Sequence, residues 1–130
     1  IDTLVDLINL VSVRSGYSIG AFDADRIEGD TLILGVGKEG EIFRGIGRGV
    51  LNIEGLPVYR DDEGGIGTPT SDEERTKITL DTKNLFVIIN AYGEEMPLDE
   101  TIAFTTGLLR QYASAENIRT DIVSADLFID

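Results

Sequence analysis

The chain has 130 residues, of which 42% are hydrophobic and 27% are charged, a composition typical of one soluble globular domain. It contains neither Cys nor His, which excludes a thiol nucleophile, a disulfide, an imidazole base and the common zinc sites. The formal net charge of −13 favours solubility and repels nucleic-acid phosphates at long range.

Nothing in the chain predicts a membrane partner. No apolar run approaches the roughly 20 residues that a bilayer-spanning helix needs, and no secretory signal is present. We therefore expect a cytoplasmic protein. The chain does not begin with Met, and its first residue already lies in a predicted helix. Residues 1–130 are accordingly expected to form a single domain that is the C-terminal part of a longer chain.

The N-terminal segment predicts a helix followed by a strand. Gly16 is expected to end the helix, and residues 17–22 to form the strand. Asn9 is a polar amide among apolar neighbours, and it either satisfies backbone groups near the following turn or faces a pocket. Asp23 closes the strand and is expected to cap the next turn. The apolar face of the helix consists of Ile1, Leu4, Val5, Leu7, Ile8 and Val11.

Short strands separated by turns are predicted for the middle of the chain, at residues 31–36, 41–46 and 57–60. Residues 35–40 read GVGKEG and match the dinucleotide-binding pattern GxGxxG. That pattern needs a helix N-terminus directly after it to hold the pyrophosphate, whereas the following residues predict a strand. A hairpin turn is therefore the preferred interpretation. The acidic run at residues 61–63 is interpreted as a solvated turn.

The C-terminal third predicts a buried strand and a second helix. Residues 85–89 read LFVII, which indicates a strand buried on both faces. A helix is predicted over residues 100–114 with Asp99 as its cap, and a last strand over residues 120–124. The buried stripe of this helix is expected to consist of Ile102, Ala103, Leu108, Leu109 and Tyr112.

These elements together indicate an α+β fold. Two flanking helices and about six short strands are typical of a β-rich mixed sheet. The many glycines between positions 35 and 67 suit strong bending, so the sheet is expected to be curled or barrel-like.

A polar segment at residues 64–76 is the strongest site candidate, because loops of this length are more often functional than idle. The amides of Gly65 and Gly67 could bind an anion or a carbonyl oxygen. Asp72 could hold an amine or polarise a water, and further hydroxyls come from Thr68, Thr70 and Ser71. The alternative is a capped turn, since a Ser or Asp followed by Glu is also a helix-start signature.

Short matches in the correct order connect the chain to a known family. Residues 4–23 read LVDLINLVSVRSGYSIGAFD, and further matches lie at Gly40-Glu41 and at Asp81-Thr82-Lys83-Asn84. This pattern resembles the editing domain of the phenylalanyl-tRNA synthetase β subunit, in its free-standing form, over nearly the whole chain. In the synthetase this domain hydrolyses tRNA mischarged with tyrosine. The resemblance implies tRNA or aminoacyl-tRNA as the partner.

The resemblance and the polar segment together define a predicted site. The residues expected to act on the substrate are Asn9, Thr70 and Asp72. The substrate pocket is expected to include Gly20, Gly65, Gly67, Thr68, Ser71, Thr82 and Ile88. Basic residues are concentrated between positions 44 and 83, and those expected to face RNA are Arg44, Arg48, Arg75 and Lys83. No metal and no cofactor is expected.

The chain departs from the family pattern at three of its positions. Gly20 stands where the synthetase typically has His, and Ile8 where it has Thr. Ile88 falls near the acid that meets the tyrosine hydroxyl. A pocket without these polar partners does not select a phenol, so tyrosine specificity does not transfer. The same changes would fit a pocket for a different, more apolar aminoacyl group.

Two functions follow as hypotheses. The first is a free-standing editing-like domain that hydrolyses or binds aminoacyl-tRNA, with loop amides stabilising the oxyanion and a polar side chain positioning water. The second is a non-catalytic module that holds a small amino-acid-like ligand or serves in interactions.

Overall fold

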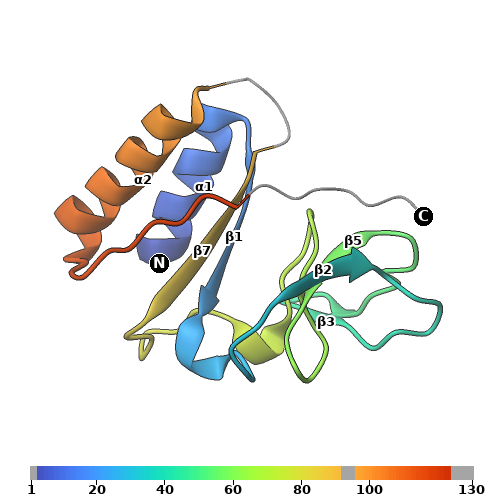
Figure 1. Cartoon of the computed structure of the whole chain (residues 1–130). Coiled ribbons are helices and arrows are strands. Elements are labelled where there is room, and N and C mark those ends of the chain that lie inside the picture. Colours follow the sequence, from blue (N-terminus) through green and yellow to red (C-terminus); the bar gives the residue numbers. More distant parts are fainter. Residues whose placement is uncertain (1–2, 92–95, 124–130) are drawn as a thin grey trace.

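The computed structural model describes residues 3–91 and 96–123 of the chain (Figure 1). Within these residues the fold is α+β, with two α-helices and three small antiparallel sheets. The helices are α1 (Thr3–Ser15) and α2 (Leu98–Ala113). Two short 3-10 helices are η1 (Ala24–Arg26) and η2 (Glu74–Thr76). The strands are β1 (Ser18–Asp23), β2 (Ile33–Val36), β3 (Arg44–Gly45), β4 (Gly49–Val50), β5 (Pro57–Arg60), β6 (Gly65–Gly67) and β7 (Leu85–Asn90).

The first sheet pairs two strands that are far apart in the sequence, and both helices cover one of its faces (Figure 1). β1 pairs antiparallel with β7, with Gly20 opposite Ile88. Successive side chains of a strand point to opposite faces. Ile19 and Ala21 of β1 lie toward α1, where they line a cavity. Phe22 points to the other face, where its ring lies against β6.

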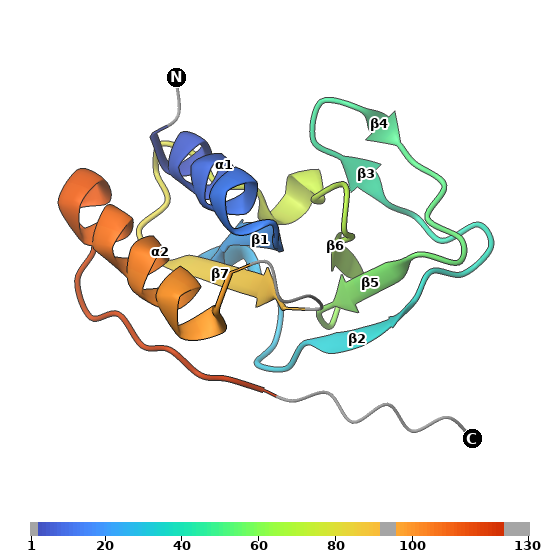
Figure 2. The same cartoon turned by 90° about the horizontal axis from the view of Figure 1, so that it is seen from above.

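The second part of the fold is a β lobe, which Figure 2 shows beside the helices and the first sheet. β2, β5 and β6 form a three-stranded sheet, and β3 and β4 form a separate hairpin. The lobe has a small core of Phe43, Ile53 and Val58, each at most 2% exposed. Gly37 makes this core possible, because a Cβ there would lie 1.8 Å from the carbonyl oxygen of Ile53.

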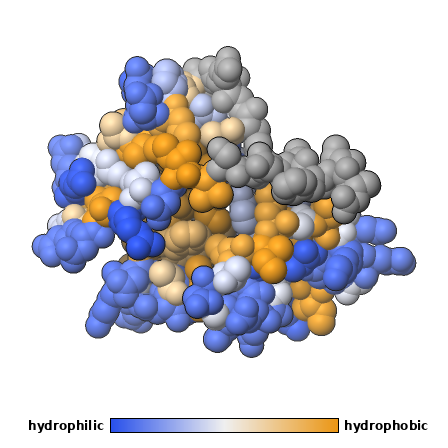
Figure 3. All heavy atoms as spheres, in the orientation of Figure 1, coloured by the Kyte–Doolittle hydropathy of each residue, from blue (hydrophilic) through white to orange (hydrophobic). Residues whose placement is uncertain are grey.

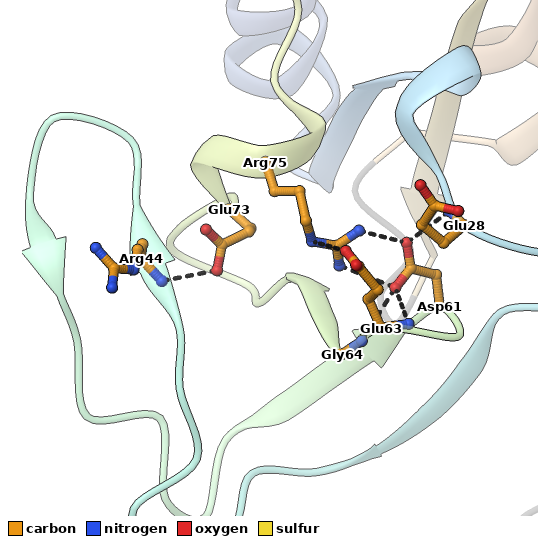
Figure 4. Close-up of polar contacts among 7 residues, drawn as sticks. All are labelled: Glu28, Arg44, Asp61, Glu63, Gly64, Glu73 and Arg75. Carbon is orange, nitrogen blue, oxygen red and sulfur yellow. Dashed lines mark hydrogen bonds and ion pairs between the residues drawn. The ribbon is translucent and has the colours of Figure 1, made fainter.

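A buried carboxylate joins three segments of the lobe (Figure 4). The side chain of Asp61, at the end of β5, is fully buried and lies 2.8 Å from the Arg75 guanidinium on η2. Its oxygens also accept hydrogen bonds from the backbone amides of Glu28, Glu63 and Gly64. Burial raises the pKa of Asp61, but Arg75 and the three amides outweigh it and lower that pKa to about 2.

A second buried acid fixes the β3–β4 hairpin. Glu73 is 7% exposed and accepts a 2.7 Å hydrogen bond from the backbone amide of Arg44 (Figure 4). The Glu73 amide donates in turn to the carbonyl of Ile66 in β6. The segment that carries Glu73 is thus held between the hairpin and the sheet.

Several sequence predictions are confirmed. Gly16 ends α1 with a φ of 79° and donates to the carbonyl of Ser12, as a C-terminal glycine typically does. Asp23 caps η1 by accepting a hydrogen bond from the Asp25 amide. The strand predicted at residues 57–60 is β5.

The prediction of a curled or barrel-like sheet is wrong. The strands divide among three separate sheets, and their lengths of two to six residues leave little to wrap around an axis. Residues 35–40 do not form a hairpin turn, because β2 pairs with β5 and not with the next strand. A strand, β3, follows that segment, so the argument against a dinucleotide site stands.

The polar segment at residues 64–76 is not one long loop. It contains β6 and η2, with a tight turn at residues 68–71 between them. The acidic run at residues 61–63 is not simply a solvated turn, because Asp61 is buried against Arg75. A cation 14 positions away in the sequence overrides the local charge pattern.

The C-terminal elements differ from the predictions in their exposure. The second helix begins at Leu98, and Pro97 precedes it without a side-chain cap, so Asp99 lies in its first turn. Tyr112 is 58% exposed, whereas Thr101 and Thr105 are buried with hydroxyls bonded to the preceding turn.

The strand β7 is half-buried and not, as the sequence predicted, buried on both faces. Residues 120–123 form no strand, and Ser124 and Ile1 lie outside the described residues.

In the described part of the chain, neither helix is long and apolar enough to span a bilayer. Figure 3 shows apolar residues gathered in the middle of one face, between hydrophilic margins.

Replacing Asp61 with Ala tests the buried carboxylate. The variant leaves Arg75 and three amide donors without their partner, so we expect a loss of about 3–5 kcal/mol in the free energy of unfolding. Glu63→Ala is the matched control, because Glu63 is 59% exposed on its side of the same guanidinium and should cost at most about 1 kcal/mol. Equal losses of unfolding free energy in the two variants, measured by urea unfolding, would contradict the structural role of the Asp61 carboxylate.

The same carboxylate predicts how stability depends on pH. The folded-state pKa of about 2 lies below the unfolded value of about 3.9. The contribution is therefore fully present above about pH 4 and is lost as the pH falls toward 2. Urea titrations between pH 2 and 5 should show this slope in the native chain and a shallower one in Asp61→Ala.

Candidate functional site

The candidate site lies at the edge of β1 that does not pair with β7. The chain after β6 turns back at residues 68–71 and forms an isolated bridge between Gly67 and Asp72. The carbonyl of Asp72 accepts a 3.0 Å hydrogen bond from the Ile46 amide, and its carboxylate accepts one from the Ala21 amide. Asp72 therefore joins β1, β6 and the β3–β4 hairpin at one point.

A cavity of about 210 Å³ lies beside this carboxylate, between α1, β1 and the segment that includes η2. Figure 2 shows η2 between α1 and the β3–β4 hairpin. The polar side chains of the wall are Asn9, Asp72 and Lys77. The rest of the wall is aliphatic and consists of Val5, Ile8, Ile19, Ala21, Ile46 and Ile78.

Asp72 is electrostatically unusual. Burial raises its pKa to about 6, although the hydrogen bond from the Ala21 amide lowers it in part. The carboxylate is thus mostly ionised at neutral pH but is a far better proton acceptor than an ordinary Asp. Perturbed carboxyl groups in clefts are typical of functional sites.

Cationic side chains lie at the margin of the cavity. Lys77 lines it and forms a 2.8 Å ion pair with Glu74, one turn earlier. Arg48, in the turn of the β3–β4 hairpin, donates a 2.8 Å hydrogen bond to the Ser71 hydroxyl next to Asp72. This margin therefore presents positive groups on an acidic chain.

The structure brings two of the predicted catalytic residues together. Asn9 and Asp72 both line the cavity, although they are separated by most of the β lobe in the sequence. Of the two interpretations of Asn9, the pocket-facing one therefore has support from the geometry. Thr70 is exposed, and its amide lies 3.4 Å from the Thr68 hydroxyl.

The predicted substrate-binding residues lie around the cavity without lining it. The Thr68 hydroxyl bonds to the carbonyl and the amide of Ser71, which closes the turn. Gly65 and Gly67 are buried in β6. The capped-turn alternative is not confirmed as a helix start, because Glu73 precedes η2 without a side-chain cap, and Thr68 closes the turn instead. Thr82 donates to Asp23 at the far end of β1.

Gly20 and Ile88 form a cross-strand pair, and Gly20 is tightly packed. A Cβ at Gly20 would lie 2.9 Å from the Phe22 ring and 3.8 Å from an Asp72 carboxylate oxygen. The space that a larger residue would need at Gly20 is therefore occupied by the Phe22 ring.

The predicted RNA-facing residues divide into two kinds. Arg48 lies at the cavity margin, and Arg44 is exposed on β3. Arg75 is committed to Asp61 and Glu63. Lys83 is exposed and follows Thr82 and precedes Asn84, whose side chains bond to Asp23 and Asp25.

Sequence reasoning missed most of the cavity wall. On the helix the signal was present, because Val5, Ile8 and Asn9 have the spacing of one helical face. Ile46 and Ile78 gave no comparable signal, since they reach the cavity only through the hairpin and the segment after η2. Among the described residues, no group of three His, Cys, Asp or Glu side chains could hold a metal ion.

Replacing Asp72 with Asn should stabilise the fold. The raised pKa means that ionisation of Asp72 is disfavoured in the folded state, so stability decreases as the pH rises from about 4 to about 6. Asn keeps an acceptor for the Ala21 amide and removes the charge. We expect a gain of at most about 3 kcal/mol at pH 8 and a much smaller one at pH 4. Thermal unfolding at the two pH values measures this, and equal shifts would contradict it.

Comparisons with known proteins identify the family. Residues 1–98 match the model of the B3/4 domain. The chain is 33% identical over 98 residues to the phenylalanine–tRNA ligase β subunit of Fusobacterium nucleatum, a match that covers 73% of this chain but 12% of that protein. It also resembles the solved N-terminal fragment of the phenylalanyl-tRNA synthetase β subunit from Pyrococcus horikoshii, with a TM-score of 0.67 and 18% identity over 85% of this chain and 40% of that one. The chain belongs to the B3/4 domain family.

Proposed function

We propose that this chain binds the aminoacyl end of an aminoacyl-tRNA in the cavity beside Asp72 and hydrolyses its ester bond. The observation that carries the proposal is the carboxylate itself. Asp72 has a pKa of about 6 and shares the wall of a 210 Å³ cavity with Asn9 and Lys77. Membership of the B3/4 family and the match to a tRNA ligase subunit direct the choice of substrate.

The reaction needs no protein nucleophile. Asp72 accepts a proton from a bound water as the water oxygen forms a bond to the ester carbonyl carbon. The bond between that carbon and the ribose oxygen then breaks, and the proton passes from Asp72 to the departing oxygen. The products are a free amino acid and a tRNA with an intact terminal ribose.

Asn9 and Lys77 supply the hydrogen-bond donors of this site. The Asn9 amide and the Lys77 ammonium are the groups of the wall that can donate to the carbonyl oxygen as negative charge develops on it. The ion pair with Glu74 holds Lys77 at the cavity margin.

The RNA is held through local charge. The net charge of −13 opposes binding of a polyanion, so a nucleic acid has to be attracted by a basic region. Arg48 and Lys77 lie at the margin of the cavity, where the terminal phosphates of a substrate would lie once its aminoacyl group is inside.

A second candidate is a non-catalytic module that binds a free amino acid in the same cavity. It is favoured by the turn at residues 68–71, whose Thr68 hydroxyl is occupied by bonds within the turn. This function would leave every ester intact while free amino acids bind with a saturable heat.

Deacylation of a panel of mischarged tRNAs tests hydrolysis. We expect at least one aminoacyl-tRNA to be hydrolysed, with a rate that rises from pH 5 to 7 around a midpoint of about 6 as Asp72 loses its proton. Asp72→Asn should lower that rate by about 10²- to 10⁴-fold. Asp62→Asn is the matched control, because Asp62 is exposed and does not line the cavity. Intact esters throughout the panel, with a folded protein, would overturn the hydrolysis.

Salt-dependent tRNA binding tests the basic margin. Arg48→Ala should weaken binding and reduce the slope of log K against log salt by about one, the value expected for one phosphate contact. Arg110→Ala, an exposed position on α2, should leave the slope unchanged. Identical slopes for the native chain and Arg48→Ala would show that Arg48 does not contact the RNA.

A further inference from the structure

We infer that the cavity selects an aminoacyl group with an aliphatic side chain and disfavours one that carries a phenol. The inference rests on the proposed function, in that an aminoacyl group is taken to occupy the cavity. It goes further because it assigns the class of side chain from the composition of the wall.

The wall has the chemistry of an aliphatic binding site. Six of its nine residues are aliphatic, and they come from four separate segments of the chain: Val5, Ile8, Ile19, Ala21, Ile46 and Ile78. Among the residues that the structure describes, no aromatic side chain contributes to it. Branched side chains pack closely against the methyl groups of another branched side chain, and each buried methylene adds to the affinity.

No polar group of the wall remains for a phenol. Asp72 is needed for the water and already accepts a hydrogen bond from the Ala21 amide, and Lys77, which is paired with Glu74, is needed for the ester carbonyl. Asn9 is needed for the ester carbonyl. A buried hydroxyl without a partner is costly, and the cost reduces affinity by about tenfold or more.

The opposite face of β1 does not supply the missing partner. Gly20 and Ile88 point away from the cavity side of the sheet, and neither carries a polar side chain. The Phe22 ring occupies the space next to Gly20. A threonyl group should be disfavoured relative to a valyl group by at most about 10²-fold, because an aliphatic site discriminates no more strongly than this against an isosteric hydroxyl.

Amino-acid amides test the inference without any ester chemistry. Calorimetric titration of the native chain with valinamide, leucinamide, threoninamide and tyrosinamide measures the selectivity directly. We expect valinamide or leucinamide to bind at least about tenfold more tightly than tyrosinamide. Tyrosinamide that binds as tightly as the aliphatic amides would overturn the inference.

Variants of the wall locate the selectivity. Ile78→Ala should weaken valinamide binding by about tenfold or more and narrow the gap to the larger amides. Ile46→Ala, at a position that is already 43% exposed, is the second variant in case the first does not fold. Val13→Ala is the control, because Val13 is 84% exposed on α1 and does not line the cavity. Unchanged affinities in both wall variants would place the ligand elsewhere and overturn the inference.

The two proposals fail in different ways. Aliphatic preference among the amides with no ester hydrolysed would overturn hydrolysis and leave the inference standing. Hydrolysis that is fastest for tyrosyl esters would overturn the inference and leave hydrolysis standing. Absence of binding by every amide and of hydrolysis of every ester would overturn both.

Discussion

The pair between Asp61 and Arg75 is the constraint on which the site depends. Asp61 holds the end of β5, the turn at Glu28 and η2 together through one fully buried carboxylate. The residues just before η2 include Asp72, and those just after it include Lys77 and Ile78. A single ion pair behind the cavity therefore sets the path of the segment that supplies much of its chemistry. Breaking a buried pair of this kind leaves an uncompensated charge, so its loss should disturb the segment that lines the cavity as well as the pair itself.

The carboxylates of Asp61 and Asp72 have opposite electrostatic surroundings. Asp61 is surrounded by donors, which hold its charge and stabilise the lobe. Asp72 has one backbone donor and an aliphatic surrounding, so its charge is kept at a cost in stability. Such a cost is common at sites where reactivity matters more than stability. The contrast distinguishes the structural carboxylate from the one that we propose to act on the substrate, in a chain that has 24 acidic residues.

Local patterns in the sequence predicted local features well and long-range ones poorly. The end of α1 at Gly16, the cap at Asp23 and the strand β5 follow from short-range chemistry, and the family follows from ordered short matches. The division into separate sheets does not, because pairing of β2 with β5 is decided by packing between distant residues. The sequence indicated only part of the cavity wall. Asn9 and Asp72 stand out as polar residues in unusual places, whereas Ile46 and Ile78 resemble any other aliphatic residue until the chain brings them together.

The pairing of β1 with β7 has a consequence for how the chain folds. Residues 24–84 lie between these two strands, so β1 and β7 can pair only when the two ends of this long segment come together. Closing such a loop costs conformational entropy before the pairing can repay it, and folding is slower when contacts are non-local. The lobe has its own core of Phe43, Ile53 and Val58, and it can become ordered before that closure. Because the cavity takes its wall from α1, from β1 and from the following segment as far as Ile78, we expect it to be completed only when that segment packs against β1, and a nascent chain to be unable to bind its ligand until Ile78 has been synthesised.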